Sequence, residues 1–204
     1  YTMPGSVSSQ FISGLLFALP LLSENSSLTV TGRIESRDYI IMTEEALERA
    51  KVRIEKNINV YGIPKAQSFQ MPNTNVEGDF SNAAFFLCAG AFTEEGLKVM
   101  GLNMASRQGD RRIVEILEAF GAKTERGLDR VTVRTGRLEG LTVDAAMIPD
   151  LVPVISVVAA AAKGTTRIVN AGRLRIKESD RIKSTADMIN ALGGKAVETE
   201  DGLV

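Results

Sequence analysis

The sequence contains no histidine, no tryptophan and only one cysteine, Cys88, among its 204 residues. Catalysis by histidine, a metal site built from histidine or several cysteines, and a disulfide within the chain are therefore excluded. Cys88 lies in an apolar run, residues 83–92, which favours a buried structural thiol over a nucleophile.

The sequence also lacks a strong charge imbalance and a long hydrophobic run. Its formal net charge is −1, with 24 Lys and Arg against 25 Asp and Glu, so we expect neither a nucleic-acid partner nor a membrane surface. Two apolar runs, residues 11–22 and 152–162, are too short to span a bilayer, and the first lacks the basic flank of a signal peptide. We therefore expect a cytoplasmic protein. The balanced net charge still allows a local basic site that binds a small anion.

The chain does have enough apolar sequence to fold. Hydrophobic residues make up 44% of it, and its length allows one large or two small domains. It begins at Tyr1 without a methionine and stops in mid-pattern at Val204. We expect it to be an internal piece of a longer protein.

Three segments share one plan, in which an apolar helix, a strand, a second, amphipathic helix and further strands follow one another. The apolar helices are expected at residues 9–22, 81–92 and 150–162, the strands at 27–31, 97–102 and 166–170, and the second helices at 39–50, 110–120 and 180–192. Gly96 and Gly164 precede a strand, and Gly121 and Gly194 follow a second helix. The period is about 70 residues, and each unit reads β-α-β-α-β-β.

The first helix of each unit is apolar nearly all round, which is typical of a helix covered on every side. The second helices carry apolar residues on one face and belong nearer solvent. We expect an α/β fold of the α+β type, with buried helices and sheets outside them. The polar segment 69–75 is the expected join between a first domain, residues 1–74, and a second, residues 75–204; an ordinary surface loop is the alternative.

Polar clusters stand where the plan places the starts of helices. Ser8 or Ser9 precedes an apolar helix, where free backbone N–H groups and hydroxyls suit a phosphate; plain capping is the alternative. Asp150, and Glu77 in the second unit, hold the same place, where the helix dipole stabilises a carboxylate. Asp150 would act as a general base only with a substrate hydroxyl in reach, and is otherwise a cap.

Residues 173–181 (RLRIKESDR) lie between a strand and a helix. Lys177, Glu178 and Arg181 suit an anionic substrate that also needs proton transfer; a solvated charged turn is the alternative. Residues 36–39 (SRDY) and 106–110 (SRQGD) are the counterparts in the other units, and the latter could serve only a turn and a cap.

Together, residues 5–11 (GSVSSQF), 36–39, 76–81 (VEGDFS), 148–150 (IPD) and 173–181 resemble the 5-enolpyruvylshikimate-3-phosphate synthase family in order and spacing. The resemblance implies transfer of the carboxyvinyl group of phosphoenolpyruvate to the 5-hydroxyl of shikimate 3-phosphate. This reaction serves aromatic amino acid biosynthesis and is the target of glyphosate. The family's fold has two lobes of three β-α-β-α-β-β units that close over the substrates. Residues 1–74 would be the last unit of one lobe, and residues 75–204 two units of the other.

The resemblance also implies roles for single residues. Those expected to bind shikimate 3-phosphate are Ser8, Ser9, Gln10, Ser36, Tyr39, Asp150 and Lys177. Asp150 would be the general base on the 5-hydroxyl, and Glu178 would take part in proton transfer at the enolpyruvyl carbon. Gln10 and Arg181 would bind phosphoenolpyruvate, while the role of Arg173 stays open. No metal or organic cofactor is implied, and the full-length protein is expected to be a monomer.

The family's catalytic lysine and several phosphoenolpyruvate-binding groups belong to segments that this sequence does not contain. We therefore expect these 204 residues alone to have little or no transferase activity. A partial lobe should also expose apolar surface. Two other interpretations stay open: an enzyme like UDP-N-acetylglucosamine enolpyruvyl transferase, which carries a reactive cysteine on a mobile loop, and a non-catalytic anion-binding fragment.

Overall fold

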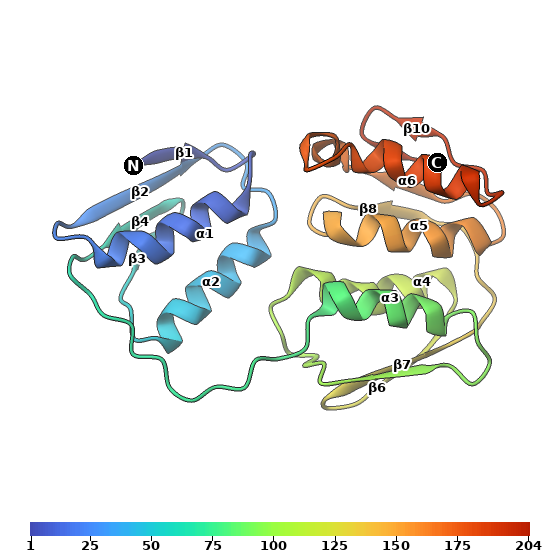
Figure 1. Cartoon of the computed structure of the whole chain (residues 1–204), viewed down its shortest axis with the longest axis horizontal. Coiled ribbons are helices and arrows are strands. Elements are labelled where there is room, and N and C mark those ends of the chain that lie inside the picture. Colours follow the sequence, from blue (N-terminus) through green and yellow to red (C-terminus); the bar gives the residue numbers. More distant parts are fainter. The chain divides into compact units, whose positions relative to one another are not determined.

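The computed structural model describes all residues, Tyr1–Val204. The chain divides into two compact bodies, an N-terminal body of Tyr1–Val76 with Arg107–Gly109 and a C-terminal body of Glu77–Ser106 with Asp110–Val204 (Figure 1). Between Ile63 and Phe80 the backbone forms neither helix nor strand. None of the helices combines the length and the apolar character that crossing a bilayer requires.

The N-terminal body is one four-stranded sheet with two helices packed together on one side of it (Figure 1). Its elements are β1 (Thr2–Pro4), α1 (Ser9–Ala18), η1 (Leu19–Leu21), β2 (Ser26–Thr31), α2 (Arg37–Arg49), β3 (Glu55–Asn57) and β4 (Val60–Ile63). The strand order is β1-β2-β4-β3, in which only β1 and β2 are parallel. Apolar side chains from both helices and the sheet form its core: Ile12, Leu16, Ile40, Leu47, Leu28, Val30, Tyr61 and Ile63.

The C-terminal body contains two sheets and one continuous apolar core. Its first half comprises α3 (Phe80–Gly90), β5 (Leu97–Met100), η2 (Gly109–Arg112), α4 (Ile113–Phe120), β6 (Lys123–Arg126) and β7 (Arg130–Arg134). Its second half comprises β8 (Thr142–Asp144), η3 (Pro149–Leu151), α5 (Val152–Ala161), β9 (Arg167–Val169), η4 (Gly172–Ile176), α6 (Arg181–Ala191), β10 (Glu198–Thr199) and β11 (Gly202–Leu203). The helices α3 and α5 pack against each other and join the halves.

The sheets reveal the internal repeat. The order β8-β9-β11-β10 reproduces β1-β2-β4-β3, again with only the first pair parallel. The plan β-α-β-α-β-β is therefore confirmed in the first and third repeats, and with it the α/β fold class. The second repeat has only the order β5-β7-β6. Its expected first strand does not form, although the Gly78 amide donates to the Gly101 carbonyl over 2.8 Å.

Several helices are shorter than their apolar runs predict. The helix expected at 9–22 ends at Ala18, because Pro20 cannot donate to a helical carbonyl and its ring crowds the preceding turn. The helices expected from residues 110 and 150 begin instead with the tighter turns η2 and η3. The α-helices follow only at Ile113 and Val152.

The prediction that the first helices are covered on every side is wrong. In α1, Phe11 and Phe17 are 58% and 42% exposed, and in α3, Phe85 and Phe86 are 59% and 62% exposed. The sheet and the neighbouring helices cover only the opposite face of each helix. On α1, for example, this covered face carries the buried side chain of Ile12. The exposed phenylalanines agree with the expectation that a partial lobe leaves apolar surface open.

Candidate active site

The segment 173–181 joins β9 to α6 and is built from a short turn, a bend at residues 177–179 and a capped helix start. The turn η4 ends at Ile176, and Lys177 has an extended backbone with φ −85° and ψ −160°. Asp180 caps α6 by accepting a hydrogen bond from the Lys183 amide over 3.0 Å. Lys177 and Glu178 therefore lie in the bend that precedes a helix N-terminus, where anions are stabilised.

Three of the predicted site residues meet at this N-terminus. Arg181, in the first turn of α6, donates from Nη1 to Asp150 Oδ1 over 2.6 Å and from Nη2 to Glu178 Oε2 over 2.8 Å. Asp150 comes from η3, the turn that leads into α5. The side chains of Arg181, Asp150 and Glu178 are 27%, 39% and 77% exposed, so a solute can reach all three.

The charges of this cluster reinforce one another. The pKa of Glu178 is lowered by the hydrogen bond to its own backbone amide, by the Arg181 guanidinium and by the nearby charge of Lys177. Burial disfavours the charge of Arg181, but the hydrogen bonds to Asp150 and Glu178 outweigh it and raise the Arg181 pKa. The guanidinium between the two carboxylates therefore stabilises the ionised form of Glu178.

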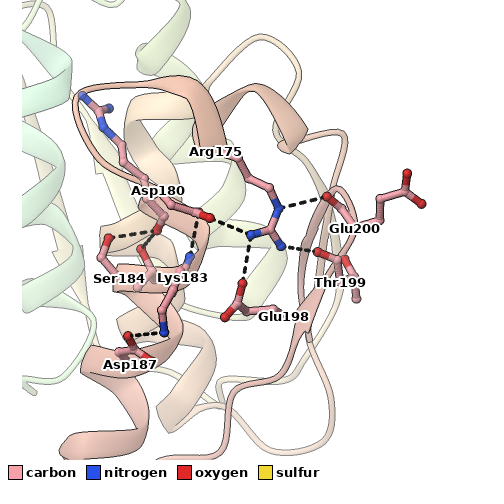
Figure 2. A network of polar contacts seen from close by, with 10 residues as sticks. Arg175, Asp180, Lys183, Ser184, Asp187, Glu198, Thr199 and Glu200 are labelled. Atoms are coloured by element: carbon pink, nitrogen blue, oxygen red, sulfur yellow. Dashed lines mark hydrogen bonds and ion pairs between the residues drawn. The ribbon is translucent and has the colours of Figure 1, made fainter.

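Arg175 fixes the segment to the hairpin β10–β11, as Figure 2 shows. Its Nη1 donates to Asp180 Oδ2 over 2.8 Å and to Glu198 Oε2 over 2.9 Å. Its Nη2 and Nε donate to the carbonyls of Thr199 and Glu200 over 2.7 and 3.2 Å. The pKa of Arg175 is raised by Glu198 first and then by Asp180. The sequence did not single out Arg175, because nothing local distinguishes it from the other cations of the segment.

The second repeat uses the corresponding polar groups within its own structure. Glu77, the counterpart of Asp150, accepts hydrogen bonds from Asn103 Nδ2 over 3.0 Å and from the Ser106 hydroxyl. Asp110 is 2% exposed and accepts from the Ser81 hydroxyl over 2.6 Å. Both acids thus accept hydrogen bonds from side chains of the second repeat itself.

In the N-terminal body, two loops carry the predicted serines and are held together at Gly5. The Gly5 amide donates to the Thr31 carbonyl over 2.8 Å, and the Gly5 carbonyl accepts from the Glu35 amide over 3.0 Å. A Cβ at Gly5 would lie 2.9 Å from the Arg33 carbonyl oxygen, so only glycine fits between the loops. The starts of α1 and α2 are thereby brought together.

Each of these helix starts carries a predicted serine. The Ser8 hydroxyl caps α1 by accepting from the Gln10 amide over 3.2 Å. Ser9 is 6% exposed, and Ser36, which precedes α2 with a left-handed backbone of φ 49°, is 3% exposed. Both hydroxyls therefore lie below the surface of the body.

A groove of about 510 Å³ runs between α1 and α2 and is lined by Ser9, Gln10 and Tyr39 among others. On its wall the Ser13 and Thr43 hydroxyls are 2.7 Å apart, and the Thr43 hydroxyl also donates to the Tyr39 carbonyl over 2.9 Å. Most of the groove surface is apolar, with Phe17 and Met42 in its lining, and the hydroxyls of Ser13 and Thr43 are bonded within its wall. Three of the five residues predicted to bind a substrate in this body line it.

A family model described as EPSP synthase (3-phosphoshikimate 1-carboxyvinyltransferase) matches residues 2–204. The chain belongs to the EPSP synthase family. The family prediction is thereby confirmed. Family membership does not test the roles of single residues. The roles of the predicted residues around Arg181 and in the α1–α2 groove therefore stay predictions.

Curated relatives named 3-phosphoshikimate 1-carboxyvinyltransferase support this membership. The relative from Clostridium perfringens is 43% identical over 206 residues, which cover 100% of this chain and 48% of the relative. The relative from Brachyspira hyodysenteriae is 44% identical over 98% of this chain and 48% of its own length. The chain thus spans about half the length of the curated EPSP synthases it matches.

Solved structures show the same fold. The EPSP synthase from Acinetobacter baumannii superposes with a TM-score of 0.76 and 25% identity, over 100% of this chain and 47% of that one. The enolpyruvyl transferase NikO from Streptomyces tendae gives a TM-score of 0.68 at 17% identity, over 99% of this chain and 49% of that one. The enolpyruvyl transferase-like fold is therefore confirmed.

Proposed function

We propose that this chain is part of an enzyme that transfers the enolpyruvyl group of phosphoenolpyruvate to the 5-hydroxyl of shikimate 3-phosphate. The observation that carries the proposal is Arg181, held between Asp150 and Glu178 at an accessible helix N-terminus in a member of the EPSP synthase family. The names of the curated relatives support the same reaction. The reaction calls for no metal and no organic cofactor.

The chemistry requires three proton transfers, two in the addition and one in the elimination. The 5-hydroxyl oxygen bonds to the central carbon of phosphoenolpyruvate while its proton leaves and the methylene carbon gains a proton. Loss of phosphate and of a methyl proton then restores the double bond. We assign the hydroxyl proton to the Asp150 carboxylate and the carbon proton to Glu178, the two acids that flank Arg181.

The contacts of Arg181 also indicate how Glu178 could become an acid. A carboxyl group whose pKa is lowered is a poor proton donor at neutral pH, and Arg181 contributes to that lowering. If phosphoenolpyruvate takes the guanidinium for itself, Glu178 loses this hydrogen bond and its pKa rises. Loss of this hydrogen bond returns the Glu178 pKa only toward its ordinary value, so the negative charge of the bound phosphoenolpyruvate would have to raise it further for proton transfer. Binding of the anion to Arg181 would release Asp150 at the same time.

In the N-terminal body we assign the phosphate of shikimate 3-phosphate to Ser8, Ser9 and Ser36, at the starts of two helices. Gln10 and Tyr39 line the groove beside them and would contact the rest of the substrate, Gln10 also reaching phosphoenolpyruvate. Because Ser9 and Ser36 are 6% and 3% exposed, their loops have to open by a small rearrangement to admit a phosphate. In the C-terminal body Lys177, half-buried, would hold shikimate hydroxyls.

The same proposal includes the place of the two bodies in the full-length enzyme, its location in the cell and its oligomeric state. The N-terminal body would be the last repeat of one lobe and the C-terminal body two repeats of the other, in a cytoplasmic enzyme that is monomeric at full length. Because the chain spans about half the length of its relatives, we propose that it has little or no activity by itself. An enzyme of the UDP-N-acetylglucosamine type is disfavoured by the names of the curated relatives.

A chimera tests the function directly. The matching half of the Clostridium perfringens relative would be replaced by this chain, and phosphate release from phosphoenolpyruvate and shikimate 3-phosphate would be followed. We expect turnover in the chimera and none in the 204 residues alone. Asp150→Asn and Glu178→Gln should each lower kcat by about 10²–10⁴-fold.

The matched control is Asp187→Asn, which removes an exposed carboxylate that pairs with Lys183 on α6, away from the Arg181 cluster. It should leave kcat unchanged. A folded chimera whose turnover is the same with and without the substitutions Asp150→Asn and Glu178→Gln would overturn the assignment of these two carboxylates. A folded chimera that binds neither substrate would overturn the proposed function itself.

A further inference from the structure

The connection between β9 and α6, residues 170–180, carries Lys177 and Glu178 and is longer than residues 32–36, which join β2 to α2. A longer connection has more conformations to lose when it is held in a single geometry. Its bend, residues 177–179, is mostly exposed to solvent, so the protein core does little to fix it. The contacts on either side of the bend therefore decide where Lys177 and Glu178 lie.

The hairpin β10–β11 holds the first part of this connection. The Asn170 amide donates to Asp201 Oδ2 over 3.0 Å, and the Ala171 amide donates to the Asp201 carbonyl over 2.7 Å. Leu174 is buried, and its amide donates to the Ala171 carbonyl over 2.8 Å. The chain is therefore anchored to the turn of the hairpin and to the core before it reaches Arg175.

Arg175 joins the two sides of the bend, as Figure 2 shows. On one side its guanidinium donates to three acceptors of the hairpin, which are the Glu198 carboxylate and the carbonyls of Thr199 and Glu200. On the other side it donates to Asp180 Oδ2 over 2.8 Å. Asp180 in turn caps α6 through its other oxygen. One guanidinium therefore ties the hairpin to the start of the helix across the bend.

These contacts are charge-assisted and partly shielded from water. The side chains of Arg175, Asp180 and Glu198 are 30%, 34% and 34% exposed. Hydrogen bonds between ionised groups are stronger than neutral ones, and a planar guanidinium holds several acceptors at fixed angles. Arg175→Lys would keep the charge but lose these angles, because an ammonium is a single point charge on a flexible stem.

We propose that Arg175 is a positioning residue for the transfer reaction, an inference that rests on the proposed function. By joining Asp180 to the hairpin, Arg175 holds Lys177 and Glu178 in place beside Arg181. Its guanidinium donates to Asp180 and to the hairpin, so it acts on the reaction through the shape of the bend. A misplacement of about 1 Å can cost about 10²-fold in rate, so the loss of Arg175 should be visible in turnover.

The first test is a carboxyl NMR titration of Glu178 in the 204-residue chain, which needs no turnover. The cations beside Glu178 are Arg181 of α6 and Lys177, and Asp150 of η3 reaches it through Arg181. The hydrogen bonds of Glu178 to its own amide and to Arg181 lower its pKa, and both depend on the shape of the bend. We expect Arg175→Ala to raise this pKa toward its ordinary value. Loss of a positive charge acts in the same direction, so a second variant has to separate position from charge.

Asp180→Asn makes this separation. Asparagine is as good a helix cap as aspartate, so α6 is retained, but the amide nitrogen that it turns toward Arg175 cannot accept a hydrogen bond. Removal of the Asp180 charge alone would lower the Glu178 pKa, whereas loosening of the bend would raise it. We expect a rise in Asp180→Asn and none in the matched control Asp187→Asn, which removes an exposed carboxylate further along α6. A Glu178 pKa that falls or stays the same in folded Asp180→Asn would overturn the proposal.

The second test is kinetic and uses the chimera with the Clostridium perfringens half. Arg175→Ala and Asp180→Asn should each lower kcat by about 10–10²-fold and change the KM for phosphoenolpyruvate by less than about threefold, because Arg181 keeps its place on α6. If Arg175 acted only on the ionisation of Glu178, a higher pKa would favour the proton-donating form and kcat would rise. Arg175→Lys should recover part of the loss. The control Arg167→Ala, which removes an exposed arginine of β9, should leave kcat unchanged.

The outcomes separate this inference from the proposed function. An active chimera whose kcat is the same with and without Arg175→Ala and Asp180→Asn would refute the role of Arg175 and leave the transfer reaction standing. A folded chimera without any turnover would count against the transfer reaction. The Glu178 titration would still decide whether Arg175 shapes the bend.

Discussion

The thiol of Cys88 offers a prediction whose size follows from the structure. Cys88 lies in α3, is 2% exposed, and has its pKa raised to about 12 by burial. At pH 8 about one such thiol in 10⁴ is ionised, against about one in four for a free cysteine of pKa ~8.5. Because only the thiolate reacts, thiol–disulfide exchange should be slower by at least about three orders of magnitude in the folded protein.

The assay compares reaction with a chromogenic aromatic disulfide at pH 8 in the native state and in guanidinium chloride. We expect one thiol to react promptly after unfolding and none on the same timescale before it, with Cys88→Ala as the blank. Prompt native labelling would refute the burial argument.

The same thiol predicts a pH dependence of stability. Its folded pKa of about 12 lies above the unfolded value of ~8.5, so the folded state holds the proton more tightly. The free energy of unfolding should be unaffected by Cys88 below pH ~8.5 and should fall as the pH rises toward 12. Cys88→Ala should flatten this alkaline decline, and an equal slope in both proteins would contradict the reasoning.

Three further predictions concern the loops that carry the candidate site. Arg175→Ala should speed amide exchange in the β10–β11 hairpin, because it removes the hydrogen bonds to Glu198, Thr199 and Glu200. The control Arg130→Ala, which removes an exposed arginine of β7, should not. Equal effects of the two substitutions would argue against the role of Arg175 in holding the hairpin. Arg181→Gln should raise the pKa of Glu178 in carboxyl NMR titrations, though not fully to the ordinary value, because the hydrogen bond to its own amide remains. Gly5→Ala should lower the free energy of unfolding in urea by ~1–3 kcal/mol, since the added Cβ meets the Arg33 carbonyl. Gly14→Ala, with open space around it in α1, should instead be neutral or stabilise by up to ~1 kcal/mol.

The sequence predicted those features that depend on neighbouring residues. Helical periodicity located every α-helix to within a few residues, and glycines such as Gly121 marked helix ends because a left-handed backbone favours glycine. The meeting of Asp150, Glu178 and Arg181 followed from matching positions in the repeat and from the resemblance. Their hydrogen bonds could not be read from spacing alone.

Features that depend on distant residues were missed. Apart from Asp180, the partners of Arg175 lie more than 20 residues further along the chain, in or beside a strand of two residues that has no readable periodicity. The sequence also did not predict that the second repeat lacks its first strand, or that α1 and α3 have exposed faces. The reason is related. Apolar sequence shows that a face can be buried, but only the other elements present decide whether it is.

The separation of the two apolar cores determines how the chain should melt. One core belongs to the N-terminal body and the other to the C-terminal body, and the stretch between Ile63 and Phe80 adds no helix or strand to either. Heat should therefore reveal two calorimetric transitions, each with its own midpoint and enthalpy, and the van't Hoff enthalpy of the whole should fall short of the calorimetric one. A single reported melting temperature would then describe neither half, and a substitution would move only the transition of the half that contains it.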